Sequence, residues 1–201
     1  MLGFEASKLL EIPIFLRLST QPALEPSFCY ETIEEINMDF ETNPEIALMD
    51  EIKIQAEVLL PVIEAARAQL GKEEADRLIL GALRAKWRDW IQRRAAQISG
   101  SPREKNDAIW AMNAPRIREG DLEIETLREE PEAHEFNVTR CRYAEFFRQL
   151  GEPDLGAVLL CEPDFEHVKV GSPEVELTRT QTIMQGACCC NFRYKFQEIP
   201  K

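Results

Sequence analysis

Histidine is scarce in this chain of 201 residues, which has two copies, His134 and His167. So few histidines exclude histidine-rich zinc sites and mechanisms that need a pair of imidazoles. Either residue alone could act as a base, but both lie in polar, loop-like sequence, and we expect both to be solvated. The chain also lacks the GxxxxGK[ST], GxGxxG, GxSxG and HExxH patterns. The chain therefore has no nucleotide-binding, nucleophile-elbow or metalloprotease motif from which its reaction could be inferred.

Positive charge and long apolar runs are lacking as well. Lysine and arginine number 24 against 36 aspartates and glutamates, for a net charge of −12. The two signs are interleaved, so no phosphate-neutralising face is evident and we expect no nucleic-acid partner. The longest apolar runs, such as 58–62 and 157–161, are much shorter than the roughly 20 residues of a membrane helix. We expect no membrane segment, and the first residues do not resemble a signal peptide.

Disulfide cross-links are not expected, although the six cysteines form an even number. They lie at positions 29, 141, 161, 188, 189 and 190, and three consecutive cysteines make a poor disulfide framework. A chain of this length with 44% apolar residues can bury a core without cross-links. We therefore expect free thiols in a reducing, cytoplasmic compartment.

The first half of the chain is predicted to be an irregular arm followed by helices. Residues 1–44 contain several prolines that break a helix, and the apolar segment 9–18 is expected to dock on the domain or on a neighbouring subunit. A homo-oligomer is thus left open. From residue 45, apolar residues at three- and four-residue steps predict a helix that kinks or restarts at Pro61 and ends at Gly71. A second helix follows, from Lys72 to about Ile98.

The second half alternates strands and helices. A shorter helix is predicted over Lys105–Met112, and the period-two segments 122–126 and 136–140 predict two neighbouring antiparallel strands. The remaining elements are helices at about 141–150 and 153–161 and strands at 174–183 and 189–196. This order predicts one α+β domain over residues 45–201, with N-terminal helices packed on a C-terminal antiparallel sheet with inserted helices.

Residues that could carry chemistry gather between positions 141 and 193. Cys141 lies where a predicted strand meets a helix, Cys161 ends an apolar helix with Asp164 three residues on, and Cys190 opens the last strand. Such junctions hold a side chain on rigid elements yet expose it to a cleft. A thiol there could act as a nucleophile, and two or three thiols with a carboxylate could instead hold Zn²⁺. Each cysteine alone could also simply fill the core.

Arginines on the last two predicted strands favour an anionic ligand or ion pairs. If 174–183 is a strand, Arg179 shares its apolar face with Val175, Leu177, Gln181 and Ile183, and a buried arginine needs an anionic partner. A protein carboxylate and a substrate carboxylate explain that partner equally well. The candidates for substrate binding on these strands are Arg179, Arg193, Thr180, Thr182 and Asn191.

Four segments, taken in order, resemble the L-2-amino-thiazoline-4-carboxylate hydrolase family. They are FNVTRCRYAE from Phe136, LGEPDLG from Leu150, LCEPD from Leu160 and TRTQTIMQGACCCNFRY from Thr178, so the motif-bearing part runs from about 135 to 196. The resemblance implies an enzyme that opens a thiazoline ring by adding water at C2, giving an N-carbamoyl-cysteine. One position departs from the family, which commonly carries aspartate where this chain has Asn191. Asparagine cannot act as a general base or bring a negative charge to a metal.

The resemblance implies a hydrolase of a small cyclic amidine or a related C–N bond. We assign the nucleophile to Cys161 or Cys190, with Cys141 in the same group, and acid–base chemistry to Asp164. Arg179 or Arg193 would bind the substrate carboxylate. No cofactor is expected, with zinc as the alternative. The second interpretation is a non-catalytic small-molecule- or metal-binding module related to vinyl-reductase-type domains. An interaction protein that uses the N-terminal arm and tryptophans 87, 90 and 110 ranks last.

Overall fold

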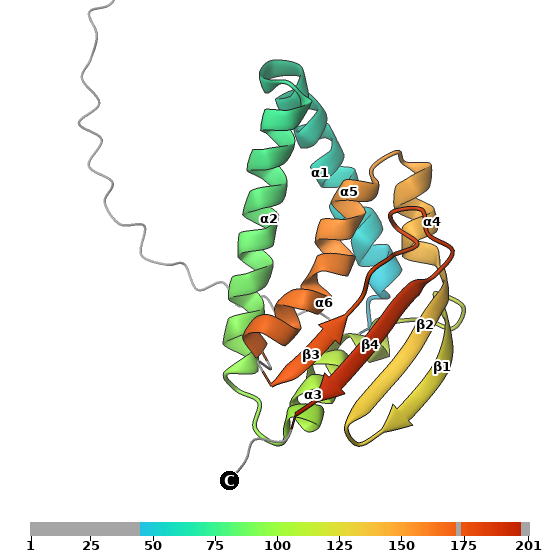
Figure 1. Ribbon diagram of the computed structural model, residues 1–201. Coiled ribbons are helices and arrows are strands. Elements are labelled where there is room, and N and C mark those ends of the chain that lie inside the picture. Colours follow the sequence, from blue (N-terminus) through green and yellow to red (C-terminus); the bar gives the residue numbers. More distant parts are fainter. Residues whose placement is uncertain (1–44, 172–173, 198–201) are drawn as a thin grey trace, which may run out of the picture. The chain divides into compact units, whose positions relative to one another are not determined.

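A computed structural model describes residues 45–171 and 174–197 of the chain. The predictions for residues 1–44, including the docking segment 9–18 and Cys29, lie outside the described residues. The first two elements are helices α1 (Leu48–Leu70) and α2 (Lys72–Ala95), which form a hairpin (Figure 1). They meet at Gly71, whose φ of +81° is accessible to glycine at little cost.

Helix α1 continues through Pro61, so the helix does not restart there, and the predicted kink stays a prediction. Proline removes one backbone hydrogen bond and usually disrupts a helix interior. Here Pro61 is exposed, while Ala56 and Ile63 on either side of it are buried, so packing holds the helix together across the missing bond. No helix in the described part of the chain is long and apolar enough to cross a membrane.

Helix α3 (Pro102–Asn113) begins earlier than predicted because of a capping box. The Ser101 hydroxyl accepts a hydrogen bond from the Glu104 backbone N–H (3.3 Å), and the Glu104 carboxylate accepts one from the Ser101 N–H (2.8 Å). This reciprocal pair fixes the helix start, and Pro102 occupies the first turn, where no N–H is needed. A short 3₁₀ turn, Ala114–Arg116, leads to the sheet.

The sheet has four strands in the order β1-β2-β4-β3, and all neighbours are antiparallel (Figure 1). The predicted antiparallel pairing of the first two strands is confirmed, and the α+β class is confirmed with it. The predicted strand that runs to Ile183 is wrong, because the third strand stops at Thr178. The strands are β1 (Leu122–Glu130), β2 (Ala133–Cys141), β3 (Val175–Thr178) and β4 (Cys190–Phe196).

A helical run connects β2 to β3. It extends to Gly171, beyond the predicted end at Cys161, because Pro163 falls in the first turn of α6, where its missing N–H is tolerated. Wider π-helical turns precede and follow α6, and such turns are frequent at functional sites. The segments are α4 (Arg142–Gln149), α5 (Pro153–Gly156), the π-turn Ala157–Cys161, α6 (Glu162–Glu166) and the π-turn His167–Gly171.

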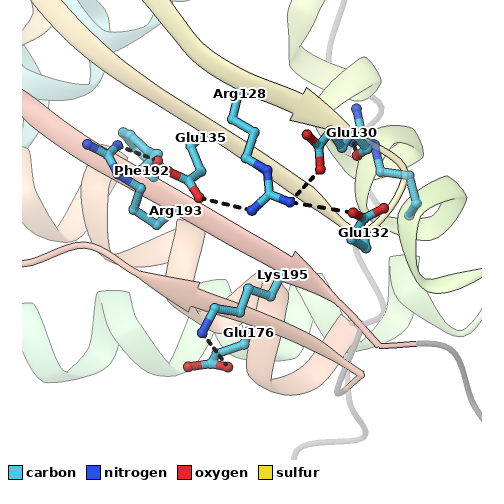
Figure 2. A network of polar contacts seen from close by, with 9 residues as sticks. Arg128, Glu130, Glu132, Glu135, Glu176, Phe192, Arg193 and Lys195 are labelled. Atoms are coloured by element: carbon cyan, nitrogen blue, oxygen red, sulfur yellow. Dashed lines mark hydrogen bonds and ion pairs between the residues drawn. The ribbon is translucent and has the colours of Figure 1, made fainter.

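The two faces of the sheet differ in polarity. The inner face packs on the helices through a cluster that includes every second residue of β4, as predicted: Cys190, Phe192, Tyr194 and Phe196. A second cluster joins the α1–α2 hairpin to α4 and α5 around Ile63, Phe147 and Leu155. The outer face carries charged side chains such as Arg128 and Lys195, which pair with Glu135 and Glu176 on the neighbouring strands (Figure 2).

Candidate functional site

The side chain of Asn191 ends the pairing of β3 with β4. Its Oδ1 accepts hydrogen bonds from the backbone N–H groups of Thr180 (3.0 Å) and Gln181 (3.1 Å), and its Nδ2 donates to Thr180 Oγ1 (2.8 Å). The Thr180 and Gln181 N–H groups are thereby bonded to a side chain of β4 and not to its backbone. The chain therefore leaves the sheet after Thr178, and the predicted strand cannot continue to Ile183.

The segment that leaves the sheet forms one wall of a small cavity. The opposite wall comes from the helical run, through Cys161 and its neighbours. The cavity measures about 140 Å³, less than the roughly 300–1,000 Å³ of pockets for drug-sized ligands, so it suits a small molecule. Its lining residues are Ala157, Cys161, Glu162, Phe165, Arg179, Thr180, Gln181, Thr182 and Gln185.

Arg179 connects the two walls of the cavity through hydrogen bonds to the helical run. Its Nη1 donates to Asp164 Oδ2 (2.5 Å) and its Nη2 to the carbonyl of Cys161 (2.8 Å). The guanidinium lies over the rings of Phe165 and Phe192, with its carbon 4.7 and 4.9 Å from their centroids. The side chain is 4% exposed. Its Nε is buried and has no hydrogen-bond partner within residues 45–171 and 174–197, so one donor of this cation stays uncommitted.

Burial changes the acid–base properties of the two groups beside Arg179. It raises the pKa of Asp164 to about 6, although the guanidinium of Arg179 opposes the rise. It also raises the pKa of the Cys161 thiol to about 12, and the negative charge of Asp164 adds to that effect. At pH 7.5 the pair is therefore a carboxylate and a neutral thiol.

The other two candidate thiols lie in the same interior but do not line the cavity. Cys141 Sγ accepts a hydrogen bond from the Ala144 N–H (3.4 Å) and caps α4, while Cys190 Sγ accepts one from the Ile183 N–H (3.2 Å). Burial raises the pKa of both, and both thiols are near enough to Cys161 to raise its pKa as well. The structure thus brings three thiols and Asp164 into one region and presents the thiol of Cys161 to the cavity.

The five cysteines in the described part of the chain are all free thiols. Among the same residues, no group of three or more histidine, cysteine, aspartate or glutamate side chains is arranged to hold a metal ion.

Arg193 is positioned differently from Arg179. It lies on the outer face of the sheet, where Nη1 donates to the carbonyl of Phe136 (2.9 Å). The same Nη1 donates to the carbonyl of Phe192 (2.7 Å; Figure 2). Its Nη2 donates to Asn137 Oδ1 (3.1 Å). Of the five substrate-binding candidates, the structure places Arg179, Thr180 and Thr182 in the cavity wall, Asn191 behind it, and Arg193 away from it.

A family model described as L-2-amino-thiazoline-4-carboxylic acid hydrolase matches residues 51–194. The chain belongs to this family. The match spans most of the chain, from α1 to β4, and contains every residue that lines the cavity. A comparison with curated proteins found no match.

Membership in the hydrolase family bears on Asn191, the position at which the sequence resemblance implies an aspartate. The Oδ1 of Asn191 is occupied by two backbone N–H groups. An aspartate would accept the same two bonds, and the Thr180 hydroxyl could reverse to donate to it. This position needs a side-chain oxygen that can accept two hydrogen bonds. Asparagine supplies one, so it keeps the shape of the cavity wall.

Arg142 and Tyr143, which lie in the segment FNVTRCRYAE, have a structural role. Asp121, which is 1% exposed, accepts hydrogen bonds from Arg142 Nη1 (2.9 Å), the Tyr143 hydroxyl (3.3 Å) and the Arg118 N–H (2.9 Å). These bonds tie the start of β1 to α4. Arg142 and Tyr143 thereby hold the helix that Cys141 caps.

Sequence reasoning missed several residues of the cavity wall and the environment of His167. Gln181 and Gln185 line the cavity, and both belong to the Thr178–Tyr194 segment that carries the family resemblance. That segment was the available signal, but the strand prediction assigned Gln181 to a packed face. His167 was expected to be solvated but is half-buried, and this burial lowers its pKa to about 4.

Proposed function

We propose that the chain hydrolyses a small cyclic amidine carboxylate, of the L-2-amino-thiazoline-4-carboxylate type, to an N-carbamoyl amino acid. The observation that carries this proposal is the position of Cys161. Of the three thiols in the region, this one lines the cavity, opposite a wall built by Arg179 and the following residues. Family membership supports hydrolysis as the reaction class.

In the proposed reaction Cys161 is the nucleophile and Asp164 carries the proton. The thiol gives its proton to the Asp164 carboxylate, Sγ forms a bond to C2, the C2–S bond of the ring breaks, and the ring sulfur takes the proton from Asp164. Water then adds to C2 and loses a proton to Asp164. As the C2–Sγ bond breaks, Cys161 takes this proton from Asp164, the hydroxyl group on C2 releases its own proton to solvent, and C2 is left as the carbonyl of the carbamoyl group.

Charge explains how a thiol with a raised pKa could react. Burial and the Asp164 carboxylate hold Cys161 in its neutral form, whereas the nearby guanidinium of Arg179 favours the thiolate. A bound amidinium would add a second positive charge beside Sγ and would lower the pKa further. The nucleophile would thus be activated when the cationic substrate occupies the cavity.

Arg179 is also the proposed partner of the substrate carboxylate. Asp164 neutralises one side of its guanidinium, and the buried Nε remains uncommitted within the described residues. A carboxylate that accepts from Nε would satisfy the buried donor. Arg193 has no part in this proposal, since its donors are engaged on the outer face.

The test is to incubate the purified protein with L-2-amino-thiazoline-4-carboxylate and measure N-carbamoyl-cysteine by mass spectrometry. We expect turnover by the unaltered chain, its loss in Cys161→Ala, and its retention in the matched variant Cys190→Ala, with circular dichroism to verify folding. Turnover should fall as the pH drops through about 6, because Asp164 must be ionised to accept the proton. Full turnover by Cys161→Ala would remove the covalent route, and none by the unaltered chain would refute the reaction.

The alternative of a non-catalytic small-molecule- or metal-binding module predicts ligand binding without product. Elemental analysis of protein purified without chelators tests the zinc alternative. A homo-oligomer and a cytoplasmic location stay predictions.

A further inference from the structure

The side-chain amide of Gln181 is held in one orientation. Its Nε2 donates to the carbonyl oxygen of Cys189 (3.2 Å) and lies 3.1 Å from Cys189 Sγ. A backbone carbonyl can only accept, so the amide nitrogen, and not its oxygen, must face Cys189. The backbone N–H of Gln181 is fixed as well, by Asn191 Oδ1 at 3.1 Å. The residue is therefore anchored at both its main chain and its amide nitrogen.

This anchoring leaves the Gln181 Oε1 free to accept a hydrogen bond. Gln181 lines the cavity, and within the described part of the chain its Oε1 has no hydrogen-bond partner. The hydroxyl of Thr182 is engaged by Gln185, with its Oγ1 3.1 Å from Gln185 Oε1 and 3.2 Å from the Gln185 N–H. The loop wall thus carries an anchored Gln181 amide whose oxygen can accept a hydrogen bond, and Arg179 in the same wall has a buried Nε with no partner among the described residues.

We infer that Gln181 is a specificity-determining residue that selects a ligand with N–H donors at C2 over one with a carbonyl oxygen there. This inference rests on the proposed function. An amidine presents N–H groups that can donate to Oε1. The 2-oxo analogue, L-2-oxothiazolidine-4-carboxylate, places an oxygen at the same position, where two acceptors would face each other without water. Both compounds carry the same carboxylate, so Arg179 contributes equally to both.

The size of the selectivity follows from the cost of an unmade buried hydrogen bond. Losing a hydrogen bond to a charged donor and leaving an acceptor desolvated corresponds to a preference of about 10- to 100-fold for the amidine. A site that hydrogen-bonds a defined group rejects an analogue lacking that group more strongly than a purely apolar pocket would.

The experiment measures Kd for both compounds by calorimetry, in a chain carrying Cys161→Ala so that the amidine is not consumed. We compare Gln181 with Gln181→Met, which keeps the length but removes the acceptor, and with the matched wall variant Gln185→Met. The amidine preference should fall to about one-fold in Gln181→Met and persist in Gln185→Met. Gln181→Leu provides a second variant if the methionine chain is unstable.

The outcomes separate this inference from the proposed function. An unchanged preference in folded Gln181→Met, or equal Kd values while Gln181 is present, overturns the role of Gln181 and leaves the hydrolase proposal standing. Amidine-selective binding that depends on Gln181, but without turnover by the chain that retains Cys161, supports the inference and refutes hydrolysis. Binding of neither compound overturns both.

Discussion

The two sides of the sheet use arginine in opposite ways. On the helix-covered side, the Arg179 side chain is 4% exposed, pairs with Asp164 and lies between two aromatic rings. On the outer side, Arg193 is 30% exposed and gives its bonds to backbone carbonyls and Asn137, with Glu135 3.6 Å away. Water screens the second charge and is excluded from the first. The same residue type should therefore contribute very differently to stability and to ligand binding on the two sides.

The largest expected effect comes from removing the inner arginine. Arg179→Met leaves the Asp164 carboxyl buried without its partner, and breaking a buried pair in this way costs about 3–5 kcal/mol of unfolding free energy. The matched variant Arg193→Met should cost about 1 kcal/mol, since its hydrogen bonds lie at the water-exposed face. Urea denaturation measures both. Equal losses would show that the two sides do not differ in the way the burial implies.

Close packing on the inner side gives the next largest effect, at Gly156. A Cβ at this position would lie 2.6 Å from Phe147 Cγ and 2.7 Å from Met184 Sδ, so Gly156→Ala should destabilise the chain by about 1–3 kcal/mol. The control is Gly81 in α2, where an added Cβ meets nothing within 4 Å. Gly81→Ala should stabilise by up to about 1 kcal/mol through helix propensity. If both variants shift Tm in the same direction, an added Cβ at position 156 does not meet the close contacts with Phe147 and Met184.

Asn191 allows a test of the cavity wall from the outer side of β4. Asn191→Asp keeps an acceptor for the Thr180 and Gln181 N–H groups, so we expect the Kd for the amidine to stay within about threefold. Asn191→Leu removes all three bonds and should weaken binding by about tenfold. Amide hydrogen exchange at residues 180 and 181 provides the structural readout. Faster exchange in the aspartate variant than in the leucine variant would contradict a positioning role.

The parts of the fold that depend on local sequence patterns were predictable. The amphipathic spacing of α1, the alternation in β4 and the antiparallel pairing of the first two strands are all properties of the segments themselves. The end of β3 was not, because it depends on the side chain of Asn191, which is distant in sequence from Thr178. Likewise, the identity of the cavity-facing thiol depends on which cysteine meets the loop in space, and a sequence pattern contains no such information.

A pH effect should distinguish the half-buried His167 from His134. Burial lowers the pKa of His167 to about 4 from an ordinary value near 6.5. The unfolded chain then binds a proton that the folded chain does not, so stability from this residue is complete above pH 6.5 and is lost as pH falls toward 4. His167→Gln should lose less stability than the unaltered chain between pH 7.5 and 5 in urea titrations. His134→Gln, where burial lowers the pKa at a more open site, is the control and should change the slope less.

The smallest effect is expected on the outer face, at the pair formed by Lys195 and Glu176 (Figure 2). The two groups are 3.8 Å apart, and their side chains are 68% and 53% exposed. Water and salt screen such a pair, so a double-mutant cycle with Lys195→Met and Glu176→Gln should give a coupling of at most about 0.5 kcal/mol that decreases further in 1 M salt. A coupling above about 1 kcal/mol that resists salt would mean that the outer face excludes water too, for example because it is covered in solution. The contrast between a water-exposed outer face and a buried inner face would then no longer hold.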